Sequence, residues 1–222
     1  ARIKVTGMKN AASLFYGCSN MTSVDLSEFD TSQTVNMRSM FESCQKLEKL
    51  DLSSLNTSNV IRMQDMFSGC ASLKTLDLTN LDTSKVQSMM SMFDGCTSLE
   101  TLNISSFDTA NVSDMQYMFA ECRSLKYLDV SNFRTDKLDV VMGMFYYCTS
   151  LTGLDLSGFD FQKVLNAGLL VMGDTSLTYL CTPKNIPVKS NQNLTLPGKS
   201  SDKWYDLEGN VVTTIPTGLE ES

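Results

Sequence analysis

Six cysteines recur every 26 residues and are the first side chains in this sequence that could do chemistry: Cys18, Cys44, Cys70, Cys96, Cys122 and Cys148. Clustered thiols can form disulfides, hold a metal ion or stay free. A fixed period of this size is typical of a solenoid, so the six should form one column, one per coil. We favour buried free thiols because a free cysteine packs as a small hydrophobe. Coils about 4.8 Å apart leave disulfides possible, and a metal site also stays open.

A second column is acidic and sits in the middle of each expected strand. Because side chains alternate along a strand, this column should point away from the core. Three interpretations remain open: a solvated ladder, a recognition strip for a basic or polar partner, and a calcium site. Calcium is the weakest, because a single file of carboxylates rarely supplies the roughly six to eight oxygens that the ion takes. The column contains Asp25, Asp51, Asp77, Asn103, Asp129 and Asp155.

The neighbouring outward column varies from copy to copy, while the acidic column barely changes. We expect such a variable column to carry any selectivity toward a partner. It contains Ser23, Lys49, Thr75, Thr101, Tyr127 and Gly153.

The methionines and the seventh cysteine are the other residues with reactive sulfur. Most of the 14 methionines fall in columns beside phenylalanine and are expected in the core, although a methionine stripe could also bind a soft metal. Cys181 stands outside the cysteine column, in the outward acidic position, so we expect it to be more exposed than the other six.

Composition removes several classes of function. The chain has no histidine, which takes away the commonest general base and metal ligand, and a net charge of −7 disfavours nucleic-acid binding. No apolar run has the roughly 18 residues of a membrane span. Since an extended repeat offers no obvious cleft, we expect a non-enzymatic protein with no catalytic residue, no cofactor and no bound metal.

The elements that position these columns can be read from one repeat, residues 47–70. Leu50-Asp51-Leu52 alternates apolar and polar residues, which predicts a half-buried strand. Asn56-Thr57-Ser58 resembles a helix start, and Val60, Met63, Met66 and Phe67 share one face of a short helix that Gly69 would end. The expected coil is strand, corner, short helix, corner.

The repeat also resembles a known family. Met92-Phe93-Asp94-Gly95-Cys96-Thr97-Ser98-Leu99 and its copy at 66–73 are similar to the BspA-like leucine-rich repeats of bacterial surface proteins. The resemblance covers about residues 8–182. It implies a leucine-rich repeat fold and a secreted or wall-attached bacterial protein with adhesive roles, and it supplies no catalytic residues.

We therefore predict an α/β solenoid, with a parallel sheet on one face and short helices on the other. Residues 1–182 form about six full coils plus partial ends, and residues 183–222, which hold all four prolines and Trp204, form a small β cap or a linker.

The expected function is a cell-surface, extracellular interaction or adhesion module that binds through its exposed strand face. The partner would be a protein or glycan on host or neighbouring cells, with no nucleic acid and no membrane insertion. The alternative is a structural spacer that holds other domains away from the cell wall. The predicted binding residues are Asp25, Lys49, Asp51, Thr75, Asp77, Thr101, Asn103, Tyr127, Asp129 and Asp155.

Overall fold

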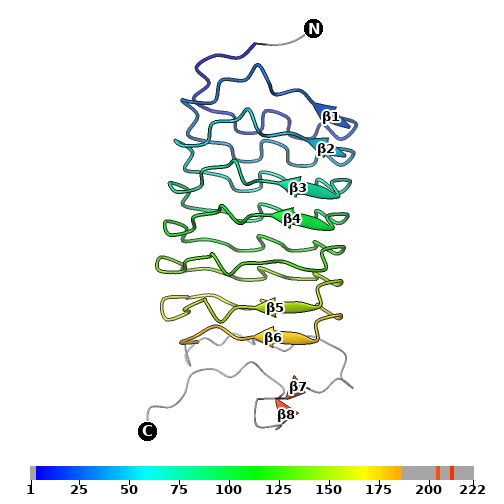
Figure 1. The fold of residues 1–222 in the computed structure, drawn as a ribbon, viewed down its shortest axis with the longest axis vertical. Coiled ribbons are helices and arrows are strands. Elements are labelled where there is room, and N and C mark those ends of the chain that lie inside the picture. Colours follow the sequence, from blue (N-terminus) through cyan, green and yellow to red (C-terminus); the bar gives the residue numbers. More distant parts are fainter. Residues whose placement is uncertain (1–3, 187–203, 206–210, 213–222) are drawn as a thin grey trace.

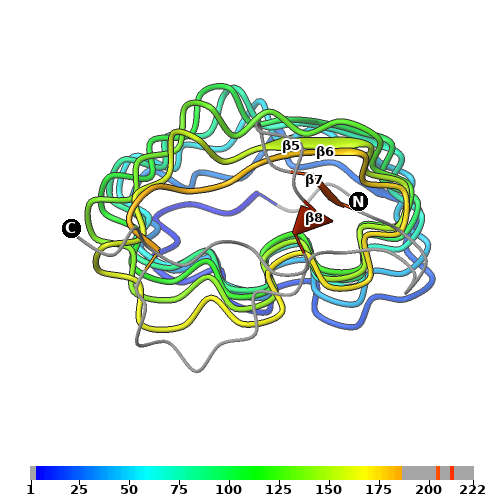
Figure 2. The same ribbon diagram turned by 90° about the horizontal axis from the view of Figure 1, so that it is seen from below.

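The fold is a stack of flattened coils, seen in a computed structural model that describes residues 4–186, 204–205 and 211–212. Each coil lies on the next with little lateral shift, so the outlines superpose along the stack (Figures 1 and 2). Short parallel strands mark one long side. They are β1 (Ser23–Val24), β2 (Lys49–Leu50), β3 (Thr75–Asp77), β4 (Thr101–Asn103), β5 (Gly153–Asp155) and β6 (Tyr179–Cys181).

Strand register follows the repeat. Ser23 pairs with Lys49, Thr75 with Thr101 and Gly153 with Tyr179, so each partner is one repeat further along the chain. Parallel pairing between neighbouring coils was predicted from the sequence, and the strand pairs confirm it. A second column of parallel bridges runs along the stack, away from the strands, through Asn10, Asn36, Arg62, Ser88, Asp114, Val140 and Asn166.

The prediction of short helices was wrong, since no helix forms in the described residues. In residues 37–44, alternate amides bond to different partners. Ser39 N–H and Phe41 N–H donate to the next coil, each at 2.9 Å, while Met40 N–H and Glu42 N–H each close a turn at 3.2 Å within their own coil. An amide given to the next coil cannot make a helical bond, so the segment becomes a chain of turns.

Two left-handed residues in each coil explain why the segment cannot continue as a helix. Ser39 and Ser43 have φ of 56° and 62°, and their counterparts one coil later, Asp65 and Gly69, have 57° and 70°. A left-handed residue reverses the local winding, so helical bonds cannot propagate through it. The expected left-handed glycine is therefore present, but it ends a turn and not a helix.

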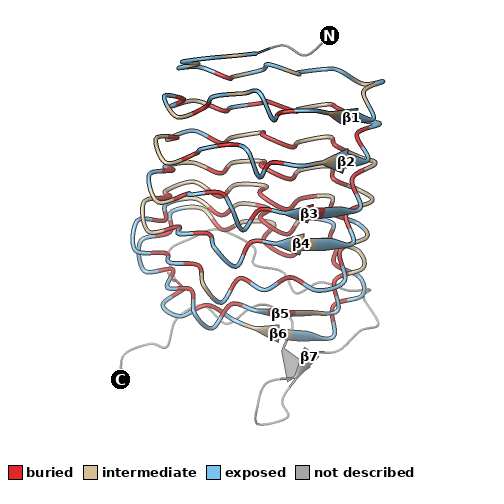
Figure 3. Cartoon of the chain, turned by 45° about the horizontal axis from the view of Figure 1, so that its top comes forward, coloured by how far each residue is buried: buried red, intermediate tan, exposed pale blue. Residues whose placement is uncertain are grey.

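The inward columns nevertheless pack as the periodicity predicts. Met63, Met66 and Phe67 are fully buried, and Figure 3 shows buried residues recurring from coil to coil along the stack. The phenylalanine rings form one continuous parallel stack, with centroids 5.3–5.9 Å apart from Phe15 to Phe145. Offset aromatic stacking at this spacing adds to the burial of each ring.

The cysteine column is a packing element made of free thiols. Each of the five buried thiols from Cys44 to Cys148 donates to a phenylalanine carbonyl of the preceding coil, as Cys70 Sγ does to Phe41 O at 3.2 Å. Burial raises the pKa of Cys44 to about 11 and that of Cys96 to about 12, so these thiols stay protonated. Cys18 differs and is exposed, because no described coil covers it.

The residues predicted to start a helix close corners instead. Asn56 Oδ1 accepts the Ser58 amide at 3.0 Å, which forms a local turn. Buried Thr31 links two coils, because its hydroxyl donates to Asn56 O at 2.9 Å and accepts the Asn56 amide at 2.8 Å. The same bridge recurs at Thr57, Thr83 and Thr109, which satisfies buried backbone groups at this corner.

The stacked backbone continues to the bridge between Asp160 and Lys184, and Ile186 is buried. Beyond it, β7 (Trp204–Tyr205) pairs antiparallel with β8 (Val211–Val212). The predicted packing of a β cap over the last coil lies outside the described residues.

Candidate functional site

All ten predicted binding residues are exposed. They lie in the strands, directly after them, or, for Tyr127 and Asp129, at the equivalent positions of the coil that forms no strand. Strand β3 shows the reason, because Thr75 and Asp77 face outward on either side of buried Leu76. The variable column and the acidic column therefore run side by side along the stack. The structure brings the predicted residues onto one surface, which we call the strand face.

The acidic column shapes the corner after each strand. Asp51 Oδ1 accepts the Ser53 amide at 2.9 Å, and Asp77 Oδ1 accepts both the Thr79 amide at 3.0 Å and its hydroxyl at 2.8 Å. The same turn bond recurs at Asp25, Asn103, Asp129 and Asp155. This repeated structural bond accounts for the near constancy of the column.

These bonds also keep the carboxylates charged. The backbone amide of the residue two positions on is the main cause that lowers the pKa of Asp51 and of Asp77. For Asp129 and Asp155 the hydroxyl of Ser131 or Ser157 is the main cause. A hydrogen bond to the charged form favours it, so the strand face carries a line of ionised carboxylates at neutral pH.

The strands pair two by two, so the ladder is interrupted between β2 and β3 and again in the fifth coil. Strand β4 pairs with β3 and β5 with β6, but no strand forms at residues 127–130 between them. Asn132 spans the interruption, because its Nδ2 donates to Phe107 O at 2.9 Å and to Ile104 O at 3.2 Å. The two coils are thus tied together at the corner and left unpaired along the strand.

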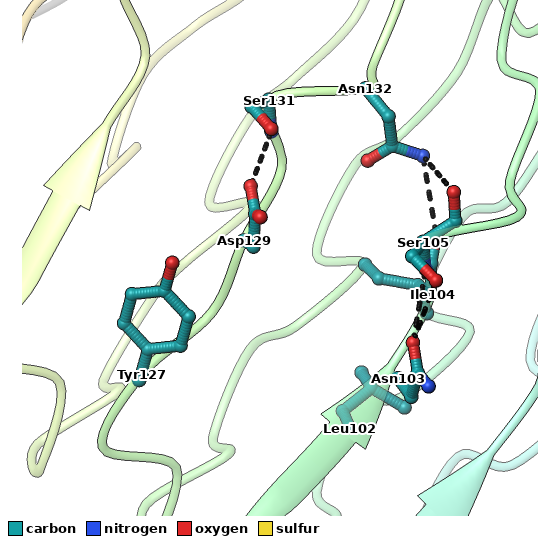
Figure 4. A pocket seen from close by; sticks show the side chains of 8 residues that line it. All are labelled: Leu102, Asn103, Ile104, Ser105, Tyr127, Asp129, Ser131 and Asn132. Atoms are coloured by element: carbon teal, nitrogen blue, oxygen red, sulfur yellow. Dashed lines mark hydrogen bonds between the residues drawn. The ribbon is translucent and has the colours of Figure 1, made fainter.

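A hollow of about 440 Å³ opens at this interruption. In Figure 4, Tyr127 and Asp129 stand on one wall and Asn103 on the other, with Asn132 at the end. Asp129 and Asn103 are held by bonds to their neighbouring serines, as the dashed lines in Figure 4 show. The lining residues are Leu102, Asn103, Ile104, Ser105, Tyr127, Asp129, Ser131 and Asn132.

Tyr127 dominates this surface, since 72% of its area is exposed. The next residue of its column is Gly153, and the one after that is Tyr179, which is 57% exposed and leans over Gly153. Tyr179 is not among the binding residues predicted from the sequence. Extending the 26-residue register from Tyr127 by two copies would have identified it.

The chemistry available on the strand face is recognition by hydrogen bonds, charge and aromatic contact. Amide, hydroxyl and carboxylate groups surround an exposed phenol, a combination that contact surfaces favour. Among the described residues, no group of three or more Cys, Asp or Glu side chains is arranged to hold a metal ion. No described helix is long and apolar enough to cross a membrane.

Comparison with known proteins places the chain in a family. It is similar to a leucine-rich repeat protein from Bacteroides ovatus ATCC 8483, with 16% identity and a TM-score of 0.40 over 84% of this chain. The match covers 63% of that protein, so this chain spans less than two thirds of its length. No curated protein matches the chain. Residues 2–77 and 71–178 match the family described as Mycoplasma protein of unknown function, DUF285, and the chain belongs to that family.

Proposed function

We propose that this protein is a non-enzymatic interaction module that binds a partner through the strand face. The observation that carries this proposal is the hollow beside Tyr127, where a largely exposed ring borders fixed polar groups. An exposed tyrosine costs little conformational entropy to immobilise and offers both apolar area and a hydroxyl, so it is well suited to a contact surface.

The acidic column and the variable column of the strand face have different roles, and this difference supports recognition of a partner. The acidic column is committed to turn bonds, whereas Lys49, Thr75, Thr101 and Tyr127 make no such repeated bond and vary in chemistry. Variable side chains on a regular scaffold are how repeat proteins present extended binding surfaces. Selectivity would therefore reside in the variable column, with the carboxylates favouring a polar or basic partner.

The resemblance to BspA-like repeats supports a location for this module. A secreted or wall-attached bacterial protein with an adhesive role would meet proteins and glycans of host or neighbouring cells. The rival function is a spacer, for which the regular stack is equally suited. A spacer has no need for an exposed tyrosine beside a hollow, and that residue favours the binding function.

Arrays of extracellular matrix proteins and of glycans test the proposal. The probes are the wild-type chain, Tyr127→Ala, and Tyr16→Ala as a matched control, since Tyr16 is 57% exposed and lies outside the strand face. We expect at least one partner that the wild type and Tyr16→Ala bind and that Tyr127→Ala binds at least about 10-fold more weakly, as for an interface hot spot. Absence of any partner, or equal binding by Tyr127→Ala, would favour the spacer.

A further inference from the structure

A column of alternating amides and ammonium groups lies at the corner after the threonine bridges, apart from the strand face. Its four central members are Asn59, Lys85, Asn111 and Lys137, each 26 residues after the last, with Gln33 before them and Lys163 after them in the same register. We call it the Asn–Lys column. Lys85 and Lys137 are exposed, and both occur in a chain whose net charge is −7.

Neutral acceptors position both lysines. Lys85 Nζ donates to Asn59 Oδ1 at 2.8 Å, and Lys137 Nζ donates to Asn111 Oδ1 at 2.6 Å. Asn111 is itself fixed, because its Nδ2 donates to Ser84 O at 2.7 Å. An ammonium group has three N–H donors, so each lysine keeps donors for a ligand after its bond to asparagine.

A second pair of exposed lysines, in a different column, provides a comparison. Lys74 and Lys126 are also two coils apart and exposed, but they alternate with Glu48 and Glu100 in their column. Opposite charges one coil apart offset each other. In the Asn–Lys column, asparagine takes the place of glutamate, so the positive charge is not offset within the column.

The two lysines face a common hollow of about 550 Å³, lined by Ile61, Lys85, Gln87, Asn111, Ser113 and Lys137. The lining contains no carboxylate, and Ile61 is its one purely aliphatic side chain. A protein partner would be expected to bury an apolar cluster at the centre of its contact. Amides, a hydroxyl and two ammonium groups instead suit a ligand that combines many hydroxyls with regularly spaced acidic groups.

We propose that the Asn–Lys column binds a linear acidic polysaccharide. Lys85 and Lys137 would contact acidic groups about 10 Å apart, which is two coil steps of about 4.8 Å each. Gln87, Asn111 and Ser113 would bond to sugar hydroxyls between them. This surface is independent of the strand face, so the chain would have two binding surfaces of different charge.

Binding of immobilised dextran sulfate and polygalacturonate, with neutral dextran as reference, tests the proposal. The variants are Lys85→Gln/Lys137→Gln and the matched control Lys74→Gln/Lys126→Gln, which has the same net charge and spacing. We expect each column lysine to contribute roughly 5-fold to affinity, the top of the range for an exposed charge pair. The first double variant should therefore bind roughly 25-fold more weakly, and the control should bind as the wild type does.

Two further variants sharpen the test. Hydrogen bonds from Ser84 are the main cause that lowers the pKa of Asp82, and the nearby Lys85 ammonium lowers it further. The charges of Lys85 and Asp82 therefore interact, and Asp82→Asn should tighten binding. Tyr127→Ala should leave polysaccharide binding unchanged, which separates this site from the strand face. Equal losses in both lysine pairs would show nonspecific charge attraction and overturn the proposal. Preference for polyglutamate or for phosphatidylserine vesicles over both polysaccharides would also overturn it.

Discussion

Gly143→Ala should destabilise the stack, because the residue lies beneath an aromatic ring of the preceding coil. Gly143 has φ of 60°, and a Cβ there would stand 2.2 Å from Cε1 and 2.4 Å from Cδ1 of Tyr117. Alanine in the left-handed region costs about 1–2 kcal/mol, and overpacking adds typically about 1–3 kcal/mol. The expected loss in the free energy of unfolding is therefore roughly 2–5 kcal/mol.

Gly95→Ala separates the two contributions. Gly95 has φ of 72°, and its Cβ would meet only ordinary contacts at 3.6 Å. This variant should lose only the backbone part, about 1–2 kcal/mol. Urea unfolding followed by circular dichroism measures both losses, provided that the slope of the transition stays constant across the variants.

A double-mutant cycle locates the clash. In a Tyr117→Ala background, Gly143→Ala should cost about as little as Gly95→Ala does in the wild type, because the ring is gone. The coupling between the two sites should then be about 1–3 kcal/mol. Equal losses for Gly143→Ala and Gly95→Ala, or additive effects of Tyr117→Ala and Gly143→Ala, would refute this packing.

Three other predictions concern the core and backbone. A thiol reagent should label Cys18 and Cys181 in the native protein and spare Cys70, Cys96, Cys122 and Cys148. Mass spectrometry of the labelled peptides measures which cysteines react. Rapid labelling of Cys96 would contradict the buried column. Burial raises the pKa of Asp174 to about 8, so the free energy of unfolding should fall as pH rises from about 4 to about 8. The melting temperature of Asp174→Asn should fall less than that of the wild type over the same pH range. The far-ultraviolet circular dichroism spectrum should lack the double minimum of helical proteins. A strong helical signal would contradict the consecutive turns at residues 37–44 and at the equivalent positions of the other coils.

The sequence predicts the inward and outward columns well because burial repeats with every coil. Leu76 lies between two outward residues in any strand, and Met66 and Phe67 must face inward in any coil that buries them. The helix prediction failed for a physical reason. Residues spaced at i, i+3 and i+7 are buried equally by one helical face and by consecutive turns, and the left-handed positions hold serine, aspartate, tyrosine and leucine as well as glycine.

The candidate site was predicted in outline and not in detail. The alternation of inward and outward residues predicts that Tyr127 and Asp129 face outward. The hollow, however, depends on the absence of a strand at residues 127–130, which no residue pattern predicts. The turn bond that the Ser53 amide donates to Asp51 Oδ1 is also not predicted by alternation, which shows only that this aspartate faces outward. Cys18 was expected to be buried with its column, yet the repeat alone says nothing about what covers an outermost coil.

Amide hydrogen exchange with a captured partner tests the strand face most directly. Residues 102–105 and 127–132 contain the lining of the hollow beside Tyr127, so their amides should exchange more slowly when the partner is bound. Residues 10–17, in the chain of turns of the first described coil, should be unaffected. Protection of residues 10–17 with none at the hollow would contradict binding through the strand face.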